Sequence, residues 1–326
     1  MRDNIVANPG SGRSPSSWGA GDPPSSTARD LVRTAYDLHV HVGPDVMTRA
    51  VDDVTLAERF LELGLAGFGL KSHYTSTAER AQVVERAVPG IDVIGALTLN
   101  AAVGGLNALA VEIAAREGAR IVWLPTVDAV NEAGARDRVY PEGVHKPLWA
   151  RIQSELREQG MEAAPVAVVD DRGEPLPELL DVLAVVARHQ LVLATGHLGR
   201  DEIFTVVDAA RAAGVEHVVV THPEFPAQDL DVADQVALVE RGALLERCFT
   251  TPYTGKCSWE RVVEGIRATG AERNLLSTDL GQPANPPVED GLALFADALL
   301  ERGVTETDIH AMTVVNSRLL AGVTVA

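Results

Sequence analysis

Residues 36–42 read YDLHVHV, a short apolar run that contains two histidines, His39 and His41, separated by one residue. Runs of similar apolar, β-prone character recur along the chain, at residues 66–70, 92–99, 120–126, 191–195, 217–221, 243–248 and 274–277. Most of the intervening stretches have the spacing of amphipathic helices, and several end in a glycine just before the next run. Strands that alternate with helices form a parallel sheet with right-handed crossovers. The eight runs therefore predict an α/β fold, a (β/α)8 (TIM) barrel. No G-x-G-x-x-G motif follows the first run, which argues against a dinucleotide-binding sheet.

The chain divides into a tail and one domain. Residues 1–28 are rich in proline, glycine and serine and lack a periodic apolar pattern, so we expect a disordered N-terminal tail. Residues 29–326 are expected to form a single barrel domain. Within it, residues 127–190 are too long for a simple connection between strands four and five. An insertion at this place in a barrel lies over the catalytic face, so we expect it to shape the substrate pocket.

Composition limits the class of protein. The 326 residues carry a formal net charge of −18, and 46% of them are hydrophobic. A field of this sign argues against nucleic acid or an anionic membrane as a partner, although a metal ion could still attract a small anionic substrate. The two cysteines cannot form a disulfide framework. No apolar run is long enough to span a bilayer, and no secretion signal is evident. We expect a cytoplasmic protein that acts on a small molecule, with homo-oligomerisation left open.

Polar residues stand at the ends of the predicted strands. His39 and His41 are two residues apart and therefore share a face, as do Lys71 and His73 after the second strand. Later strands close with single polar residues, namely His197, His222 and Asp279. Catalytic groups of a (β/α)8 barrel come from the C-terminal ends of several strands, which is the pattern seen here.

This series resembles the amidohydrolase superfamily of metal-dependent hydrolases. Its members carry H-x-H on strand one, a lysine that is often carboxylated, single histidines on strands five and six, and an aspartate on strand eight. The resemblance spans about residues 36–320, and VVNSRLLAG (residues 314–322) resembles the helix that closes the barrel in many members. The chain is also similar to an uncharacterised bacterial branch known only as a domain of unknown function. By position, the resemblance implies metal ligands at His39, His41, His197, His222 and Asp279.

The lysine departs from the superfamily pattern. In two-metal members the bridging lysine usually lies on strand four, but here that strand reads RIVWLPT (residues 120–126) and contains no lysine. Lys71, on strand two, is the suitable lysine. A buried ammonium beside a metal is costly, so one interpretation is a carboxylated Lys71 that joins two metals as a ligand. The other is a cationic Lys71 that pairs with Asp279 or binds a substrate carboxylate.

The ligand types suggest the chemistry. Histidines with carboxylate or carbamate oxygens suit one or two Zn²⁺ ions, with Mn²⁺ or Fe²⁺ as alternatives. A bound metal lowers the pKa of its water and polarises the carbonyl under attack. Asp279 would then be the catalytic general base, which returns the proton to the leaving group. We therefore expect hydrolysis of an amide, cyclic amide or lactone bond in a small molecule.

The candidate substrate-binding residues are His73, Tyr74, Tyr140, Arg247 and Tyr253. The three tyrosines follow strands two, four and seven, and His73 shares a face with Lys71. Arg247 stands beside Glu246 at the end of strand seven. It either binds a substrate carboxylate or carbonyl in a forked geometry or forms a structural ion pair within the barrel.

Three other functions stay open. Phosphoesterases of the polymerase-and-histidinol-phosphatase type also open with D-L-H-x-H, although this chain has GPD (residues 43–45) where that family often has S-D-G. Some barrels with this site are metal-dependent decarboxylases. A catalytically silent barrel that binds a ligand is the third alternative. Asp279 argues against it, because binding alone needs no proton shuttle.

Overall fold

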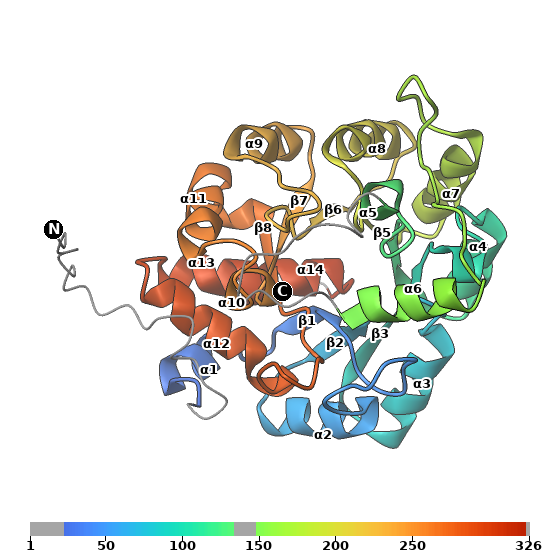
Figure 1. Ribbon diagram of the computed structural model, residues 1–326. Coiled ribbons are helices and arrows are strands. Elements are labelled where there is room, and N and C mark those ends of the chain that lie inside the picture. Colours follow the sequence, from blue (N-terminus) through green and yellow to red (C-terminus); the bar gives the residue numbers. More distant parts are fainter. Residues whose placement is uncertain (1–22, 134–147, 324–326) are drawn as a thin grey trace, which may run out of the picture.

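The computed structural model describes residues 23–133 and 148–323. Within them, parallel strands pair in the order of the chain, and helices surround the strands (Figure 1). The strands are β1 (Tyr36–Val40), β2 (Gly67–Leu70), β3 (Asp92–Thr98), β4 (Ala119–Trp123), β5 (Val192–Ala194), β6 (Val218–Thr221), β7 (Leu244–Cys248) and β8 (Asn274–Ser277).

The last strand returns to the first and closes the barrel. Val40 and Leu280 form a parallel bridge just beyond β8. The backbone N–H of Asp279 donates to the His39 carbonyl oxygen at 2.8 Å, and that of His41 donates to the Leu280 carbonyl oxygen, also at 2.8 Å. The predicted (β/α)8 barrel is confirmed, and its closure places the end of β1 directly beside the end of β8.

Most helices pack against the outside of the strands, where they bury the outward-facing apolar residues. In chain order the helices are α1 (Ser26–Leu31), α2 (Asp53–Glu62), α3 (Ala78–Ala87), α4 (Ala108–Arg116), α5 (Val130–Ala133), α6 (Leu148–Glu158), α7 (Pro177–Arg188), α8 (Arg200–Ala212), α9 (Val232–Glu240), α10 (Thr250–Tyr253), α11 (Trp259–Thr269), α12 (Val288–Leu300), α13 (Glu306–His310) and α14 (Asn316–Leu320). Short 3₁₀ or π turns add η2 (Ala101–Val103), η4 (Ala271–Arg273) and η5 (Ala311–Val315).

A small apolar core fills the interior of the barrel and extends to its N-terminal end. Leu38, Trp123 and Leu275 belong to it, and Leu320 and Ala321 join them from α14 and the residue that follows it. The last helix therefore closes this end of the barrel. The polar residues at the opposite, C-terminal ends of the strands are left to line the open mouth.

The N-terminal boundary of the domain lies earlier than residue 28. Ser25 caps α1 by accepting a hydrogen bond from the backbone N–H of Ala28, and Ala28 itself is buried. The Ser25 hydroxyl and backbone N–H both donate to the Asp297 carboxylate of α12, at 2.5 and 2.8 Å. The expected end of the tail thus falls inside α1, because the cap and the contact with α12 hold a segment whose composition suggested disorder.

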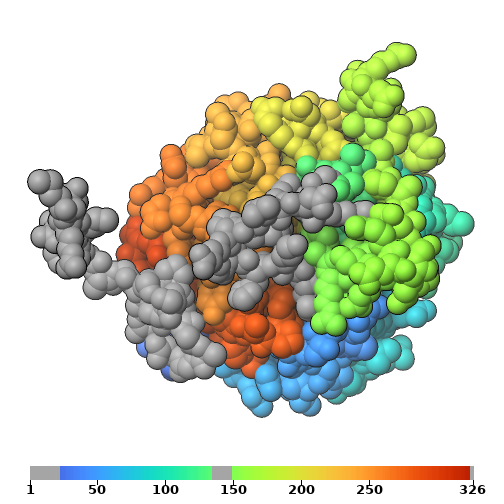
Figure 2. All heavy atoms as spheres, in the orientation of Figure 1, coloured from blue at the N-terminus to red at the C-terminus, as the bar shows by residue number. Residues whose placement is uncertain are grey.

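The insertion after β4 reaches the mouth of the barrel. It contributes α5, α6 and α7, and Trp149 of α6 lines the cavity described below. In the space-filling view the green segment that includes α6 lies over this face of the molecule (Figure 2). The expectation that the insertion shapes the pocket is therefore met. Among the described residues no helix combines the length and apolar character needed to cross a bilayer.

Candidate metal centre

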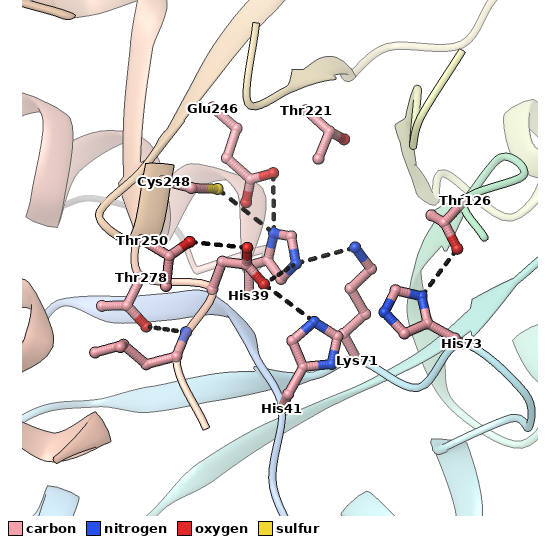
Figure 3. Close-up of polar contacts among 12 residues, drawn as sticks. His39, His41, Lys71, His73, Thr126, Thr221, Glu246, Cys248, Thr250 and Thr278 are labelled. Carbon is pink, nitrogen blue, oxygen red and sulfur yellow. Dashed lines mark hydrogen bonds and ion pairs between the residues drawn. The ribbon is translucent and has the colours of Figure 1, made fainter. Parts of the chain in front are cut away.

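His39 and His41 direct the same ring nitrogen to a single carboxylate oxygen. The Nε2 atoms of His39 and His41 lie 3.3 and 3.1 Å from Asp279 Oδ1 (Figure 3). The pairing register of β1 shifts between Asp37 and Val40, yet both imidazoles point into the barrel mouth. The three ligand atoms lie within 4.8 Å of one another, as the prediction of a shared face requires.

The remaining predicted ligands surround this trio. Lys71 Nζ lies 2.9 Å from His39 Nε2. The His197 and His222 rings are 5.0 Å apart between centroids, and the His222 ring lies 6.3 Å from that of His39. The structure thus brings all six predicted ligand residues to the mouth. His73 also belongs to the group, because its ring stacks on that of His41 at 4.9 Å.

Two of the histidines have a buried glutamate at their other ring nitrogen. His39 Nδ1 lies 3.3 Å from Glu246 Oε2, and His197 Nδ1 lies 2.9 Å from Glu132 Oε1. A carboxylate at Nδ1 favours the tautomer with its proton there, which leaves the lone pair of Nε2 for a metal. Cys248 Sγ is a second neighbour of His39 Nδ1, at 3.7 Å. The hydrogen-bonded pair of His39 and Glu246 is typical of metal ligands. The contact between His197 and Glu132 is close but lacks hydrogen-bond geometry.

Four of the histidines are held in the protonation state that a metal requires. Burial is the largest cause that lowers the pKa of His41, His73, His197 and His222 well below the usual range, and neighbouring cationic or imidazole groups add to it. The rings are therefore neutral near pH 7, as ligation demands. His222 Nδ1 is buried and has no hydrogen-bond partner among the described residues.

Asp279 is held in an uncommon backbone conformation. Its φ is 55°, in the left-handed region, and His222 at the end of β6 has φ 30°. Such strained positions cluster at functional sites, where the surrounding structure imposes them. Burial alone would raise the pKa of Asp279, but His39, His41 and Lys71 outweigh it and hold that pKa well below its usual range. The Asp279 carboxylate is therefore ionised.

Lys71 makes no ion pair with Asp279. Among the described residues no carboxylate oxygen lies within ion-pair distance of Lys71 Nζ, so that part of the cationic interpretation is wrong. The ammonium lies 5.2 Å from the centroid of the Trp123 ring, and burial lowers its pKa. Trp123 ends β4, the strand on which the superfamily lysine usually lies.

The donor set fits a metal. His39, His41 and Asp279 offer two imidazole nitrogens and one carboxylate oxygen from buried or half-buried side chains. Three protein ligands with one open position are typical of catalytic Zn²⁺ sites. Lys71, His197 and His222 stand beside this trio and could complete a second position.

A cavity of about 320 Å³ opens above these residues. Its lining includes His41, Met47, Arg49, Lys71, His73, Trp149, His197, His222, Phe225, Thr250, Thr254, Lys256, Asp279, Gln282, Pro283, Ala284 and Asn285. Its volume is at the lower end of the range for small-molecule sites. Arg49 and Lys256 were not predicted from the sequence, because both lie on irregular loops where no periodicity indicates which way a side chain points.

Most of the predicted substrate-binding residues lie elsewhere. Only His73 lines the cavity, where its Nδ1 is 2.9 Å from Thr126 Oγ1. Tyr74 and Tyr253 are not among the lining residues, and Tyr253 stacks on Phe249 at 5.0 Å. Tyr140 lies outside the described residues.

Of the two interpretations of Arg247, substrate binding is wrong and a structural ion pair is confirmed, with Glu224 as the partner. Its guanidinium is fully buried and pairs with Glu224, while its Nε donates to Asn274 Oδ1 at 2.8 Å. Successive side chains of a strand point to opposite faces. Since Glu246 turns inward to His39, Arg247 must turn outward, so it neither reaches the cavity nor pairs with Glu246.

Sequence comparison gives the family. A model described as a family of unknown function (DUF6282) matches residues 34–246. The chain belongs to this family. No curated protein matches the chain in sequence.

Solved structures share the fold of this DUF6282 protein. An amidohydrolase from Pseudomonas aeruginosa is similar with a TM-score of 0.59 and 12% identity, covering 92% of this chain and 99% of that one. A metallo peptidase from Rhodobacter sphaeroides gives 0.57 and 13%, covering 89% and 99%. A mutant organophosphorus hydrolase from Deinococcus radiodurans gives 0.51 and 16%, covering 93% and 98%. At the level of the fold, the resemblance to amidohydrolases is confirmed.

Proposed function

We propose that this protein is a metal-dependent hydrolase that cleaves an amide, cyclic amide or lactone bond in a small molecule. One observation carries the proposal: two imidazole Nε2 atoms converge on one carboxylate oxygen at the mouth of the barrel. This trio borders a cavity of suitable size for a small substrate. The fold shared with known metal-dependent hydrolases supports the same reading.

His39, His41 and Asp279 would hold a first metal, and Lys71, His197 and His222 a second. Zn²⁺ is the expected ion, with Mn²⁺ or Fe²⁺ as alternatives for this donor set. When bound, the metal supplies Lewis acidity and lowers the pKa of water. Glu246 and Glu132 orient His39 and His197 for this purpose through their Nδ1 atoms.

Asp279 is the residue that moves the proton. Its Oδ1 faces the two histidines, while its Oδ2 accepts a hydrogen bond from the Thr250 hydroxyl at 2.9 Å. The hydroxyl fixes the plane of the carboxylate, so that one oxygen stays directed at the reacting centre. Ionised Asp279 accepts a proton from water there and delivers it to the departing nitrogen or oxygen.

Lys71 is proposed to be carboxylated on Nζ. Its ammonium is buried beside His39, and among the described residues no carboxylate oxygen lies within ion-pair distance of it. Burial lowers its pKa toward the neutral amine that reacts with CO₂. The carbamate formed would bring an anionic oxygen ligand to a group of neutral imidazoles, where two metals would otherwise repel each other.

The test combines metal content with turnover. Protein expressed with supplementary metal should hold one or two transition-metal ions per chain and should hydrolyse members of an amide, cyclic amide and lactone panel. Hydrolysis should cease after chelation and return with metal. Less than about 0.2 metal per chain would contradict the proposal, since such sites bind tightly. Turnover confined to phosphate monoesters, or release of CO₂ from carboxylic acids, would instead support the phosphoesterase or the decarboxylase.

A further inference from the structure

Among the described residues, basic side chains outnumber carboxylates around the cavity, although the protein is strongly acidic. The whole chain has a formal charge of −18, yet the described lining contains three basic side chains and a single carboxylate, that of Asp279. The three basic residues are Arg49, Lys71 and Lys256. A pocket whose charge is opposite to that of its protein selects ligands of negative charge.

The three cations are not equivalent. Arg49 is compensated, because its Nε and Nη2 lie 2.7 and 2.6 Å from Asp45 Oδ2. Lys71 belongs to the metal centre through its contact with His39. Lys256 makes no ion pair with any described residue; its ammonium donates to Thr254 Oγ1 at 2.9 Å. Among the described residues that line the cavity, Lys256 is therefore the cation that neither pairs with a carboxylate nor contacts a predicted metal ligand.

Lys256 contacts the same aromatic ring as two histidines of the metal centre. Its Nζ lies 5.4 Å from the centroid of the Phe225 ring. The Phe225 ring in turn lies 4.8 Å from that of His222 and 6.0 Å from that of His197. A molecule lying along Phe225 could therefore reach the metal ligands with one end and Lys256 with the other.

Lysine is also rare in this chain. Only three of its 28 basic residues are lysines, Lys71, Lys146 and Lys256, and the first and last of these line the cavity. Lys146 lies outside the described residues. On the exposed faces of α4 and α6, by contrast, the cations of the ion pairs are arginines.

We propose that Lys256 binds the carboxylate of an anionic substrate, and that the enzyme acts on small carboxylic acids whose amide or lactone group lies a few atoms from that carboxylate. The choice of reaction rests on the proposed function, whereas the binding of the anion does not. One uncompensated ammonium matches one negative charge, which favours a carboxylate over a phosphate dianion. Thr254 holds the ammonium in place for this contact.

The test compares two ligands that differ by one charge. Succinamate has a carboxylate and an amide, and succinamide has two amides. Calorimetry on the metal-loaded full chain should show tighter binding of succinamate, and Lys256→Met should weaken it about 10- to 100-fold, as expected for a charge-assisted hydrogen bond. Succinamide binding and metal content should not change, and Lys256→Arg should keep most of the affinity. Inorganic phosphate, the competing anion, should bind more weakly than succinamate.

Arg116→Met is the matched control, since it removes one positive charge from a side chain on α4 that is 71% exposed. If Lys256→Met binds succinamate as wild type does, or if wild type does not prefer succinamate, the inference is overturned. Should the variant fold poorly, reductive methylation of wild type gives a second readout by peptide mass spectrometry, and succinamate must protect Lys256. If succinamate binds preferentially but no amide, cyclic amide or lactone is hydrolysed, the proposed hydrolase function is refuted. The inference that Lys256 binds a carboxylate would still hold.

Discussion

Asp279 presents its two carboxylate oxygens to different neighbours. Oδ1 faces His39 and His41, and Oδ2 is held by the Thr250 hydroxyl. The left-handed backbone at φ 55° turns the side chain back over the end of β1, where the histidines stand. Because its two oxygens have different neighbours, Asp279 can serve both as a metal ligand and as a proton carrier.

Replacement of this carboxylate should therefore affect rate more than structure. Asp279→Asn keeps the shape and the hydrogen bond from Thr250 but has little basicity. We expect a loss of about 10²- to 10⁴-fold in kcat, the usual size of a general-base contribution, with the fold and most of the metal retained. Steady-state kinetics with elemental analysis measures both, and near-normal turnover would remove Asp279 from the mechanism.

The buried glutamates act through the histidines that they contact. Glu132→Gln and Glu246→Gln should each lower metal affinity about 10- to 100-fold, because the amide no longer fixes the imidazole tautomer as a carboxylate does. Competition with a fluorescent chelator measures this affinity. Glu240→Gln, on the exposed end of α9, is the matched control and should bind metal as wild type does. Equal affinities in all three variants would exclude the orienting role.

At the scale of elements, the seam between β8 and β1 positions the site. The buried Asp37 carboxylate accepts hydrogen bonds from the backbone N–H and the hydroxyl of Thr278, at 3.0 and 2.5 Å. Beyond Leu280 the chain passes directly over the His41 carbonyl at Gly281, whose φ is 130°. This close passage is what brings the strand-eight aspartate to the strand-one histidines.

Gly281 is required for that passage. A Cβ at this position would collide with the His41 carbonyl oxygen, and the backbone conformation is one that L-residues rarely adopt. We expect Gly281→Ala to lower the free energy of unfolding by about 1–3 kcal/mol or more and to weaken metal binding, because His41 must shift. Chemical denaturation and metal titration check both effects. Gly173→Ala provides the comparison, since its φ is also positive but nothing lies within 4 Å of the added Cβ.

Lys71 reaches the site from the end of β2, and the proposed carboxylation makes the number of bound metals depend on it. If Lys71 is a carboxylated bridge, Lys71→Ala should remove about one metal per chain. Short-chain carboxylic acids or bicarbonate should then restore part of the activity, because they supply the missing anionic ligand. Elemental analysis and rescue kinetics give the answer. Full metal stoichiometry with only a weaker substrate affinity would favour the cationic interpretation instead.

Sequence was sufficient for the barrel and for the residues at its strand ends. Parallel strands of a barrel end at one edge, so His197, His222 and Asp279 could be placed together without knowledge of any contact. Sequence analysis failed where the direction of a side chain depends on packing. Arg247 and Glu246 are adjacent in sequence, and only the contact of Glu246 with His39 establishes which of them faces inward.

Loops and the insertion were beyond prediction for a related reason. Lys256 lies on an irregular segment after α10, and no period of apolar residues indicates its direction. Glu132 lies on the short helix α5 and meets His197, which follows β5, the next strand along the chain. Such contacts depend on the folded path of the insertion, which local sequence does not encode. At the N-terminus, the contact between Ser25 and Asp297 was not predicted, because it joins residues that are far apart in the sequence.

At the scale of the whole molecule, the two ends of the barrel have opposite physical character. Apolar side chains fill the N-terminal end, with Leu320 packed among them, and ionisable groups are concentrated at the mouth. Buried polar groups of this density cost stability unless each is paired or bound to a ligand. The protein therefore keeps its site at the expense of stability, and a bound metal should recover part of that cost.

Metal binding and thermal stability should accordingly be coupled. A ligand that binds only the folded state stabilises it by about 2.7 kcal/mol at 100 times its Kd. For a domain of this size that corresponds to a rise of about 4–5 °C in Tm, so chelation should lower the melting temperature by this amount and added Zn²⁺ should restore it. Differential scanning calorimetry gives the comparison. His41→Ala removes one ligand nitrogen from the trio, so its melting temperature should respond much less to chelator. A wild-type protein that loses its metal by elemental analysis but melts unchanged would show that these side chains do not bind the ion in the folded state.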